Sequence, residues 1–294
     1  MHDPAESPVP PWRVRVPASS ANLGAAFDAV ALALDLPLEV APAPEGSPDA
    51  APAGHPAVKA FRSAGGRGQI SVHARFPGGR GLGFSGAARV AGLVAADAQR
   101  GAREPGDVLG RATELEGHAD NVAASITGGV VAVAGGRVTS IPLGCALAVV
   151  LWIPDRETAT DHARRSLPDA VSLADASFNI GRTALLVAAL AAGDVDALRI
   201  ATEDRLHQDR RLAHVPATRA AMEAALAGGA YAAWLSGSGP SAAAFAAPDH
   251  AGTVASGLPS GGRALVVGIA SAGATIMAPP DLSGRSVGPD LKER

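Results

Sequence analysis

Lysine is nearly absent from this chain of 294 residues. Only Lys59 and Lys292 occur, so arginine supplies the other 23 of its 25 basic side chains. A Walker A phosphate loop needs a lysine directly after its glycines, and imine chemistry needs a lysine amine in a pocket. Neither lysine follows a glycine loop. The sequence therefore excludes both mechanisms, and arginine is the side chain left to hold an anionic ligand.

Cysteine and long apolar runs are also scarce. The single cysteine, Cys145, permits no internal disulfide and indicates a reducing, cytoplasmic location. The first dozen residues lack the basic start and apolar stretch of a secretory signal. The longest uncharged segment, 224–248, is interrupted at 237–240 by Gly-Ser-Gly-Pro, so a membrane helix is a poor interpretation. A net charge of −3 gives no indication of a nucleic-acid partner.

The chain does contain enough apolar material for two ordinary domains. Hydrophobic residues make up 47% of it, and strand-like and helix-like patterns alternate until residue 154, after which helices dominate. We expect an α+β protein with one domain over 13–154 and a second over 155–277. Residues 1–12 and 278–294 are expected to be flexible ends.

A glycine-rich loop follows a predicted strand at 69–76. It reads Pro-Gly-Gly-Arg-Gly-Leu-Gly-Phe-Ser-Gly over 77–86 and leads into a predicted helix. A strand, a glycine loop and a helix N-terminus together form an anion-binding arrangement. Ser85 stands near that N-terminus, where its hydroxyl either caps the helix or reaches a magnesium ion on bound phosphates. The residues alone leave both roles open.

Two glutamates and a polar cluster form a second group of candidates. Glu114 and Glu116 lie on one predicted helix, about 200° apart around its axis, so at most one can face a shared site. Periodicity does not choose between them. His118, Asp120 and Asn121 follow directly, and they are candidates either for chemistry or for capping the next helix.

Arginines and a second loop of small residues complete the candidates. Arg164 lies on a short predicted helix, and Arg211 ends the run Asp-Arg-Leu-His-Gln-Asp-Arg-Arg that begins at Asp204. Such charge runs are usually solvated surfaces, yet arginine suits bidentate binding of a carboxylate. The loop 236–240 is either a tight turn or a place where backbone approaches another backbone or a ligand.

In order along the chain, these segments resemble the GHMP family of small-molecule kinases. Three stretches carry the resemblance: Pro-Ala-Ser-Ser-Ala-Asn-Leu-Gly at 17–24, Gly-Leu-Gly at 81–83 with Ser85, and Leu-Ser-Gly-Ser-Gly-Pro-Ser at 235–241. Three further stretches are similar to the branch that phosphorylates homoserine, and they are Glu-Gly-His-Ala-Asp-Asn-Val-Ala at 116–123, Ala163-Arg164 with Leu167-Pro168, and Asp-Arg-Leu-His-Gln at 204–208.

The resemblance implies a fold and a reaction. The N-terminal domain would be ribosomal-S5-domain-2-like and carry the nucleotide, the C-terminal domain would be ferredoxin-like, and the site would lie between them. The γ-phosphoryl group of ATP would pass to the side-chain hydroxyl of L-homoserine, a step of threonine biosynthesis that depends mainly on positioning and charge neutralisation. ATP and Mg²⁺ are the implied cofactors. The enzyme would be cytoplasmic, and members of the family often form homodimers.

Matching positions assign the nucleotide and the metal to the glycine loop. Its backbone N–H groups would wrap the phosphates, and the following helix would add its dipole. Ser85 and Glu114 would hold magnesium. The ATP-binding candidates are Pro77, Gly78, Gly79, Arg80, Gly81, Leu82, Gly83, Phe84, Ser85, Gly86 and Ala87.

The same matching assigns the acceptor. Asn22 and Asp28 would receive the amino group of homoserine, and Arg164 and Arg211 its carboxylate. Asn121 stands where mevalonate-type kinases carry a catalytic aspartate. Because an amide is not a useful base, we expect no strong general base, with the hydroxyl proton leaving to a phosphate oxygen. The catalytic candidates, which also contact substrate, are Asn121, His118 and Thr160; the further substrate-binding candidates are Ser236, Gly237 and Gly239.

Departures from the family pattern keep two alternatives open. Phe84 and Gly86 stand where Gly-Leu-Gly-Ser-Ser-Ala has serine and alanine, and Ala25-Ala26 stands where Pro-Gly is common. Phe84 adds a ring to a phosphate loop, which bears on ATP affinity. His55 stands where asparagine is typical, so the adenine contacts stay unassigned. The alternatives are a sister kinase for shikimate, pantoate or mevalonate, and a relative that binds ligand without turnover.

Overall fold

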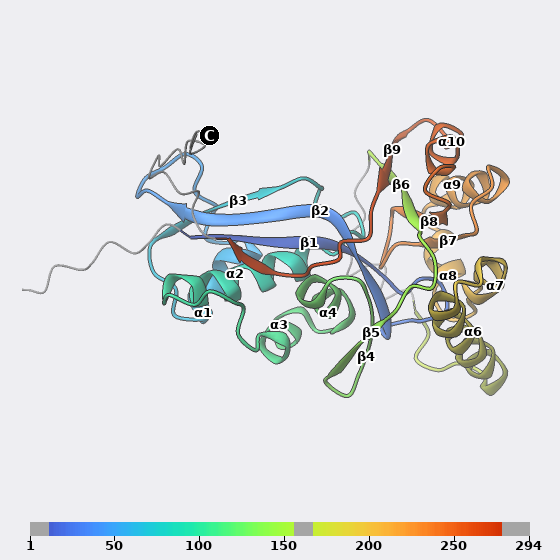
Figure 1. Cartoon of the computed structure of the whole chain (residues 1–294), viewed down its shortest axis with the longest axis horizontal. Helices are drawn as coiled ribbons and strands as arrows, with labels where there is room; N and C mark the ends of the chain where they lie inside the picture. The colour runs from blue at the N-terminus through green and yellow to red at the C-terminus, as the bar shows by residue number, and fades with distance from the viewer. Residues whose placement is uncertain (1–11, 156–166, 278–294) are drawn as a thin grey trace, which may run out of the picture.

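The computed structural model describes residues 12–155 and 167–277, which form two antiparallel sheets with helices packed against them. The molecule is elongated, with the first sheet and α1–α4 in one half and most of the second sheet and α6–α10 in the other (Figure 1). The predicted α+β class with two domains is confirmed. Trp12, assigned to a flexible end, is instead buried near the ring of Phe61. The remaining end residues lie outside the described part.

The first sheet has the order β10-β1-β2-β4-β5, and β3 pairs with the second half of β2. β2 is 14 residues long, so its first part pairs with β4 and its last part with β3. Residues 30–34 are buried at every position, so both faces of this part of β2 are covered. The strands are β1 (Arg13–Ala21), β2 (Val30–Ala43), β3 (Gln69–Ala74), β4 (Val130–Ala134), β5 (Arg137–Ile141) and β10 (Thr275–Met277).

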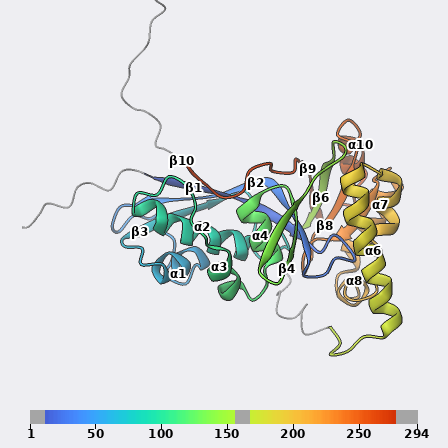
Figure 2. The ribbon, with the colours of Figure 1, turned by 60° about the horizontal axis from the view of Figure 1, so that its bottom comes forward.

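Four helices cover one face of this sheet, as the second view shows (Figure 2). The central helix, α2, is rich in glycine and alanine, and these small residues let the neighbouring helices approach closely. A Cβ on Gly92 would lie only 2.1 Å from the carbonyl oxygen of Ala57 in the adjacent helix. The helices are α1 (Pro56–Ser63), α2 (Phe84–Gln99), α3 (Leu109–Glu116) and α4 (Asp120–Thr127).

The second sheet has the order β7-β8-β6-β9. Along the chain, helices lie between β6 and β7 and between β8 and β9. This is the arrangement of a ferredoxin-like domain. Trp152, Trp234 and Phe245 are fully buried in its core. The strands are β6 (Ala148–Pro154), β7 (Ala232–Leu235), β8 (Ala242–Ala246) and β9 (Gly262–Val267); the helices are α6 (Leu173–Ala192), α7 (Val195–Ala201), α8 (Gln208–Leu212), α9 (Pro216–Ala227) and α10 (Ala251–Ser256).

Sheet membership changes between β5 and β6. We expected the first domain to extend to residue 154. β6 instead pairs with β8 and β9 and belongs to the second sheet, so the change of sheet lies one strand earlier than expected. The chain then returns to the first sheet, where β10 pairs with β1. The two halves are therefore joined by two crossings of the chain.

α6 is the one described helix that is long and apolar enough, by length and composition, to cross a membrane, with a mean hydropathy of 1.2. Polar contacts tie it to the rest of the protein. Asn179 is buried and donates to the carbonyl oxygen of Ala25, and Arg182 pairs with Glu203. α6 also packs against α7, as a helix of the second domain does.

The turn between β1 and β2 reaches from the first half to the second. Asn22, Leu23 and Asp28 have positive φ, a conformation that side chains rarely adopt. Gly24 also has positive φ, and a Cβ there would lie 2.0 Å from the carbonyl oxygen of Thr202. This close approach requires glycine. It places Asn22 and Asp28 at the junction of the two halves.

Candidate active site

A cleft at this junction collects most of the predicted site residues. The β1–β2 turn, the glycine loop, the connection between α3 and α4, the helix α8 and the 236–240 loop each contribute to its wall. Its lining residues are Asn22, Asp28, Gly79, Arg80, Gly81, Gly83, Phe84, Ser85, Glu116, His118, Asp120, Asn121, Arg211, Gly237 and Ser238. Segments far apart in the sequence thus meet at one site.

The glycine loop is shaped for an anion. Gly79, Gly81 and Gly83 all have positive φ, and Gly83 precedes α2 without a side-chain cap. The first N–H groups of α2 are therefore not satisfied by a capping side chain, as an anion-binding helix N-terminus requires. Ser85 does not cap α2; its Oγ contacts the guanidinium of Arg89 instead. Of the predicted loop residues, Pro77, Gly78, Leu82, Gly86 and Ala87 do not line the cleft.

The two small-residue loops dock on each other. A Cβ on Gly81 would lie 2.2 Å from the carbonyl oxygen of Ser236, and Ser236 Oγ donates to the Gly81 carbonyl at 2.7 Å. The loop 236–240 therefore combines both interpretations: it is a tight turn, in which Gly239 N donates to the Ser236 carbonyl, and its backbone closely approaches that of Gly81. Ser236 is fully buried and Gly239 does not line the cleft, whereas Gly237 and Ser238 do.

The ring of Phe84 turns to one side of the loop. It makes edge contacts with His55 and Phe76, with ring centroids 5.7 and 5.8 Å apart. His55 is itself fixed, because its Nδ1 accepts a hydrogen bond from Ala57 N at the start of α1. The extra ring is accommodated by an aromatic cluster beside the loop, and the loop keeps its left-handed glycines.

Asn121 lies beneath the glycine loop. Its Oδ1 accepts a hydrogen bond of 2.8 Å from Ser19 Oγ, and a Cβ on Gly83 would lie 3.0 Å from the same oxygen. Its NH₂ group donates to Asp120 Oδ1 at 3.4 Å and has a second hydrogen to donate. The expectation that Asn121 is no base fits this arrangement.

His118, a predicted catalytic residue, forms a pair with Asp120, for which the sequence left chemistry and helix capping open. The carboxylate of Asp120 is only 2% exposed, and its Oδ1 lies 2.9 Å from His118 Nδ1. The other ring nitrogen, Nε2, lies 3.8 Å from Glu116 Oε1, so two carboxylates orient the imidazole. Asp120 makes no side-chain cap at α4, although its Oδ1 does accept from Asn121 N. The spacing His-Ala-Asp-Asn is the signal that could have identified the pair.

The structure places the two glutamates on different faces of α3. Glu114 is exposed and does not line the cleft, so its predicted role as a magnesium ligand beside Ser85 is not supported by its position. Glu116 lines the cleft instead, and its Oε2 forms an ion pair with the same Arg89 that contacts Ser85. The helix turn of about 100° per residue explains why only one of the two can face α2.

Arg211 marks the opposite end of the cleft. The residue is 5% exposed, and its guanidinium donates to the Gly237 carbonyl at 3.1 Å and lies above the ring of Phe27. Asn22 donates to the same carbonyl, and its Oδ1 accepts from Asp28 N. The predicted carboxylate and amino contacts Arg211, Asn22 and Asp28 are thus brought together. Thr160 and Arg164 lie outside the described residues.

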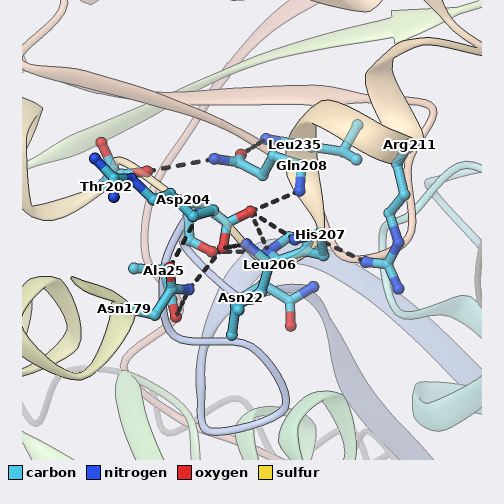
Figure 3. A network of polar contacts seen from close by, with 12 residues as sticks. Asn22, Ala25, Asn179, Thr202, Asp204, Leu206, His207, Gln208, Arg211 and Leu235 are labelled. Carbon is cyan, nitrogen blue, oxygen red and sulfur yellow. Dashed lines mark hydrogen bonds and ion pairs between the residues drawn. The ribbon is translucent and has the colours of Figure 1, made fainter. Parts of the chain in front are cut away.

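A buried network holds Arg211 in place (Figure 3). The carboxylate of Asp204 accepts hydrogen bonds from Asn179 Nδ2 and from the backbone N–H groups of Leu206, His207 and Gln208. Burial would raise the pKa of Asp204, but its electrostatic interaction with His207 and these hydrogen bonds lower the pKa below its ordinary value.

His207 links this network to Arg211. Its Nε2 lies 2.8 Å from the carbonyl oxygen of Gly24, and Nδ1 lies 3.2 Å from an Arg211 nitrogen. Arginine can only donate, so Nδ1 accepts and Nε2 carries the proton. Burial, aided by the charge of Arg211, lowers the pKa of His207 despite the opposing effect of Asp204. The imidazole is therefore neutral at physiological pH.

Comparisons with known proteins give a consistent result. Residues 53–129 match the GHMP kinases N terminal domain and residues 186–264 match the GHMP kinases C terminal model. A homoserine kinase from Thermus thermophilus is 41% identical over 87% of this chain and 96% of its own length. Homoserine kinase from Streptomyces coelicolor is 39% identical over 90% and 94%. The solved homoserine kinase from Cytophaga hutchinsonii superposes with a TM-score of 0.79 at 25% identity, over 94% of this chain and all of that one.

Proposed function

The chain belongs to the homoserine kinases of the GHMP kinase family, and we propose that it transfers the γ-phosphoryl group of ATP to the side-chain hydroxyl of L-homoserine. The observation that carries this function is the arrangement of the cleft. An anion-binding glycine loop lies on one side, Arg211 lies on the other, and Asn121 and His118 line the same space. A phosphate donor and an amino acid acceptor can therefore meet within one cleft.

ATP binds with its phosphates on the glycine loop. The backbone N–H groups at 79–86 and the N-terminus of α2 neutralise phosphate charge, which suits a chain with no lysine in this loop. Arg80 stabilises the loop by donating to the carbonyl oxygens of Pro154 and Asp155. Phe84 and His55 lie beside the loop, where their rings are available to a nucleotide base.

Magnesium fits Ser85 and Glu116, because a hydroxyl and a carboxylate are the oxygen donors that this ion prefers. Glu116 Oε2 is buried, and its partner among the described residues is the cationic guanidinium of Arg89, so this oxygen already lies in a position that holds a positive charge. In the described part of the chain, no group of three or more His, Cys, Asp or Glu side chains could hold a metal alone. Phosphate oxygens and water would complete the coordination. The ion, when bound, neutralises charge on the transferring phosphate.

The acceptor binds through its two charged ends. The guanidinium of Arg211 binds the carboxylate of L-homoserine, and Asn22 and Asp28 bind its amino group. Thr160 and Arg164 stay predicted contacts of the same substrate. These contacts select an amino acid over shikimate, pantoate or mevalonate, none of which has an amino group to pair with Asp28.

Positioning does most of the catalytic work. The amide NH₂ of Asn121 orients the acceptor hydroxyl, and His118 is held beside it by Asp120. The hydroxyl proton leaves to a phosphate oxygen, since phosphoryl transfer of this kind does not demand a strong base. A cytoplasmic location and a homodimer also stay predictions.

ADP release with Mg²⁺ and ATP tests the function. We expect turnover with L-homoserine and at least about 100-fold lower kcat/KM with shikimate, pantoate or mevalonate, because each lacks a charged contact. Turnover with one of these alcohols but not with L-homoserine would overturn the assignment of the acceptor. An absence of turnover with all four would indicate a binding protein.

A further inference from the structure

Arg89 lies where the proposed magnesium ligands meet. It follows Ser85 by four residues on α2, so the two side chains share one face of the helix. The same guanidinium nitrogen contacts Ser85 Oγ and the carboxylate oxygen Oε2 of Glu116 at the end of α3. One cation therefore already bridges both oxygen donors.

The bridge is partly shielded from solvent. The side chain of Arg89 is 25% exposed and that of Glu116 is 9% exposed. Removing one member of such a pair leaves the other poorly hydrated, so the contact is stronger than an ion pair on the open surface. Burial lowers the pKa of the Arg89 guanidinium, yet arginine stays charged at neutral pH.

A second cation cannot share the same oxygen without repulsion. Mg²⁺ binding at Ser85 and Glu116 must displace Arg89, and the cost of breaking the bridge is subtracted from the affinity for the metal. Phosphate oxygens of ATP add further ligands for the metal and offer Arg89 a new anionic partner. Metal and nucleotide should therefore favour one another's binding.

Resting on the magnesium site of the proposed function, we infer that Arg89 is an internal counter-ion that competes with free Mg²⁺ for Glu116 and Ser85. Arg89 lowers the affinity of the Ser85–Glu116 site for Mg²⁺ alone, so that the metal binds there mainly together with the nucleotide. Arg89 is a positioning residue here, since it acts through Glu116.

Titration with Mn²⁺, followed by the electron paramagnetic resonance of the free ion, tests this inference without turnover. Without nucleotide, Arg89→Met should bind Mn²⁺ about tenfold more tightly than the wild type, because the carboxylate loses its competitor. Arg100→Met is the matched control, since Arg100 follows the same helix and pairs with Asp97 far from the cleft. It should leave Mn²⁺ binding unchanged.

Two further variants fix the interpretation. Arg89→Gln removes the charge but keeps a polar chain, and it should show the same gain if Arg89→Met fails to fold. Adding Glu116→Gln to Arg89→Met should abolish the gain. Adding ATP should tighten Mn²⁺ binding more in the wild type than in Arg89→Met.

Mn²⁺ binding that is unchanged or weaker in the folded Arg89 variants would overturn the inference. So would a gain that persists after Glu116→Gln. Weaker ATP binding with unchanged metal affinity would show that Arg89 serves the phosphates only, which also overturns it. Failure of the proposed function would appear separately, as a wild type that does not phosphorylate L-homoserine.

Discussion

Glu116 and Glu114 are chemically identical, and only their places on α3 distinguish them. Glu116 faces Arg89 and the cleft, whereas Glu114 is exposed. Glu116→Gln should lower kcat at saturating L-homoserine about tenfold or more and raise the Mg²⁺ concentration needed for half-maximal rate, because an amide is a weaker metal ligand. Glu114→Gln is the control and should change neither value. Steady-state kinetics over a range of Mg²⁺ concentrations measure both, and a larger defect in the Glu114 variant would refute the choice.

Arg211 allows a test of carboxylate binding. Arg211→Ala should raise the KM for L-homoserine about 10- to 100-fold and change the KM for ATP less than about threefold, because one charge-assisted contact is lost at the acceptor end only. Arg211→Lys should recover little, since lysine cannot form the planar pair of hydrogen bonds. Equal increases in both KM values would argue against carboxylate binding by this residue.

At the scale of elements, the contact between the two small-residue loops governs the anion site. Gly81 has positive φ, and a Cβ there would meet the carbonyl oxygen of Ser236 at 2.2 Å. Gly81→Ala should therefore lose most ATP binding and lower the free energy of unfolding by about 1–3 kcal/mol. Gly110→Ala, on α3 with open space around it, should raise stability by about 0.5–1 kcal/mol. Calorimetry of ATP binding and denaturant unfolding check the pair; full ATP affinity in Gly81→Ala would contradict this account.

Elements with a clear local pattern could be predicted from the sequence. The strand at 69–76 and the apolar face of α2 follow from the local spacing of apolar residues. The glycine loop between them predicted an anion-binding site. What escaped prediction depends on packing over long distances. The choice of Glu116 requires knowing which face of α3 meets α2. The place of β6 in the second sheet requires knowing that β8 and β9 flank it.

Buried side chains with distant partners were the other gap. Asp120 and Asp204 look like ordinary loop acids in the sequence, but each is buried and bonded to a histidine or to several backbone groups. Burial of an acid cannot be inferred from spacing alone. The short α8 and the three-residue β10 are stabilised by neighbours rather than by their own pattern.

For the whole molecule, the network around His207 joins the two halves and makes its stability depend on pH. The pKa of His207 lies below its ordinary value of 6.5, so the folded protein binds fewer protons there than the unfolded chain. The stability contributed by neutral His207 is complete above about pH 6.5 and is lost as pH falls toward the lower folded pKa. Asp204, lowered from 3.8, adds a loss of the same sign in stronger acid. His55, whose pKa burial also lowers, acts in the same direction as His207.

Urea unfolding from about pH 7.5 to about 5.0 should therefore show a falling free energy of unfolding in the wild type, with a slope of up to about 1.4 kcal/mol per pH unit for each titrating histidine. His207→Gln keeps a donor for Gly24 O and an acceptor for Arg211 without titrating, so part of the slope should disappear. His55→Gln is the matched control at the edge of the first half, and its smaller effect should leave most of the slope intact. An identical slope in wild type and His207→Gln would mean that protonation of this imidazole does not loosen the junction between the halves.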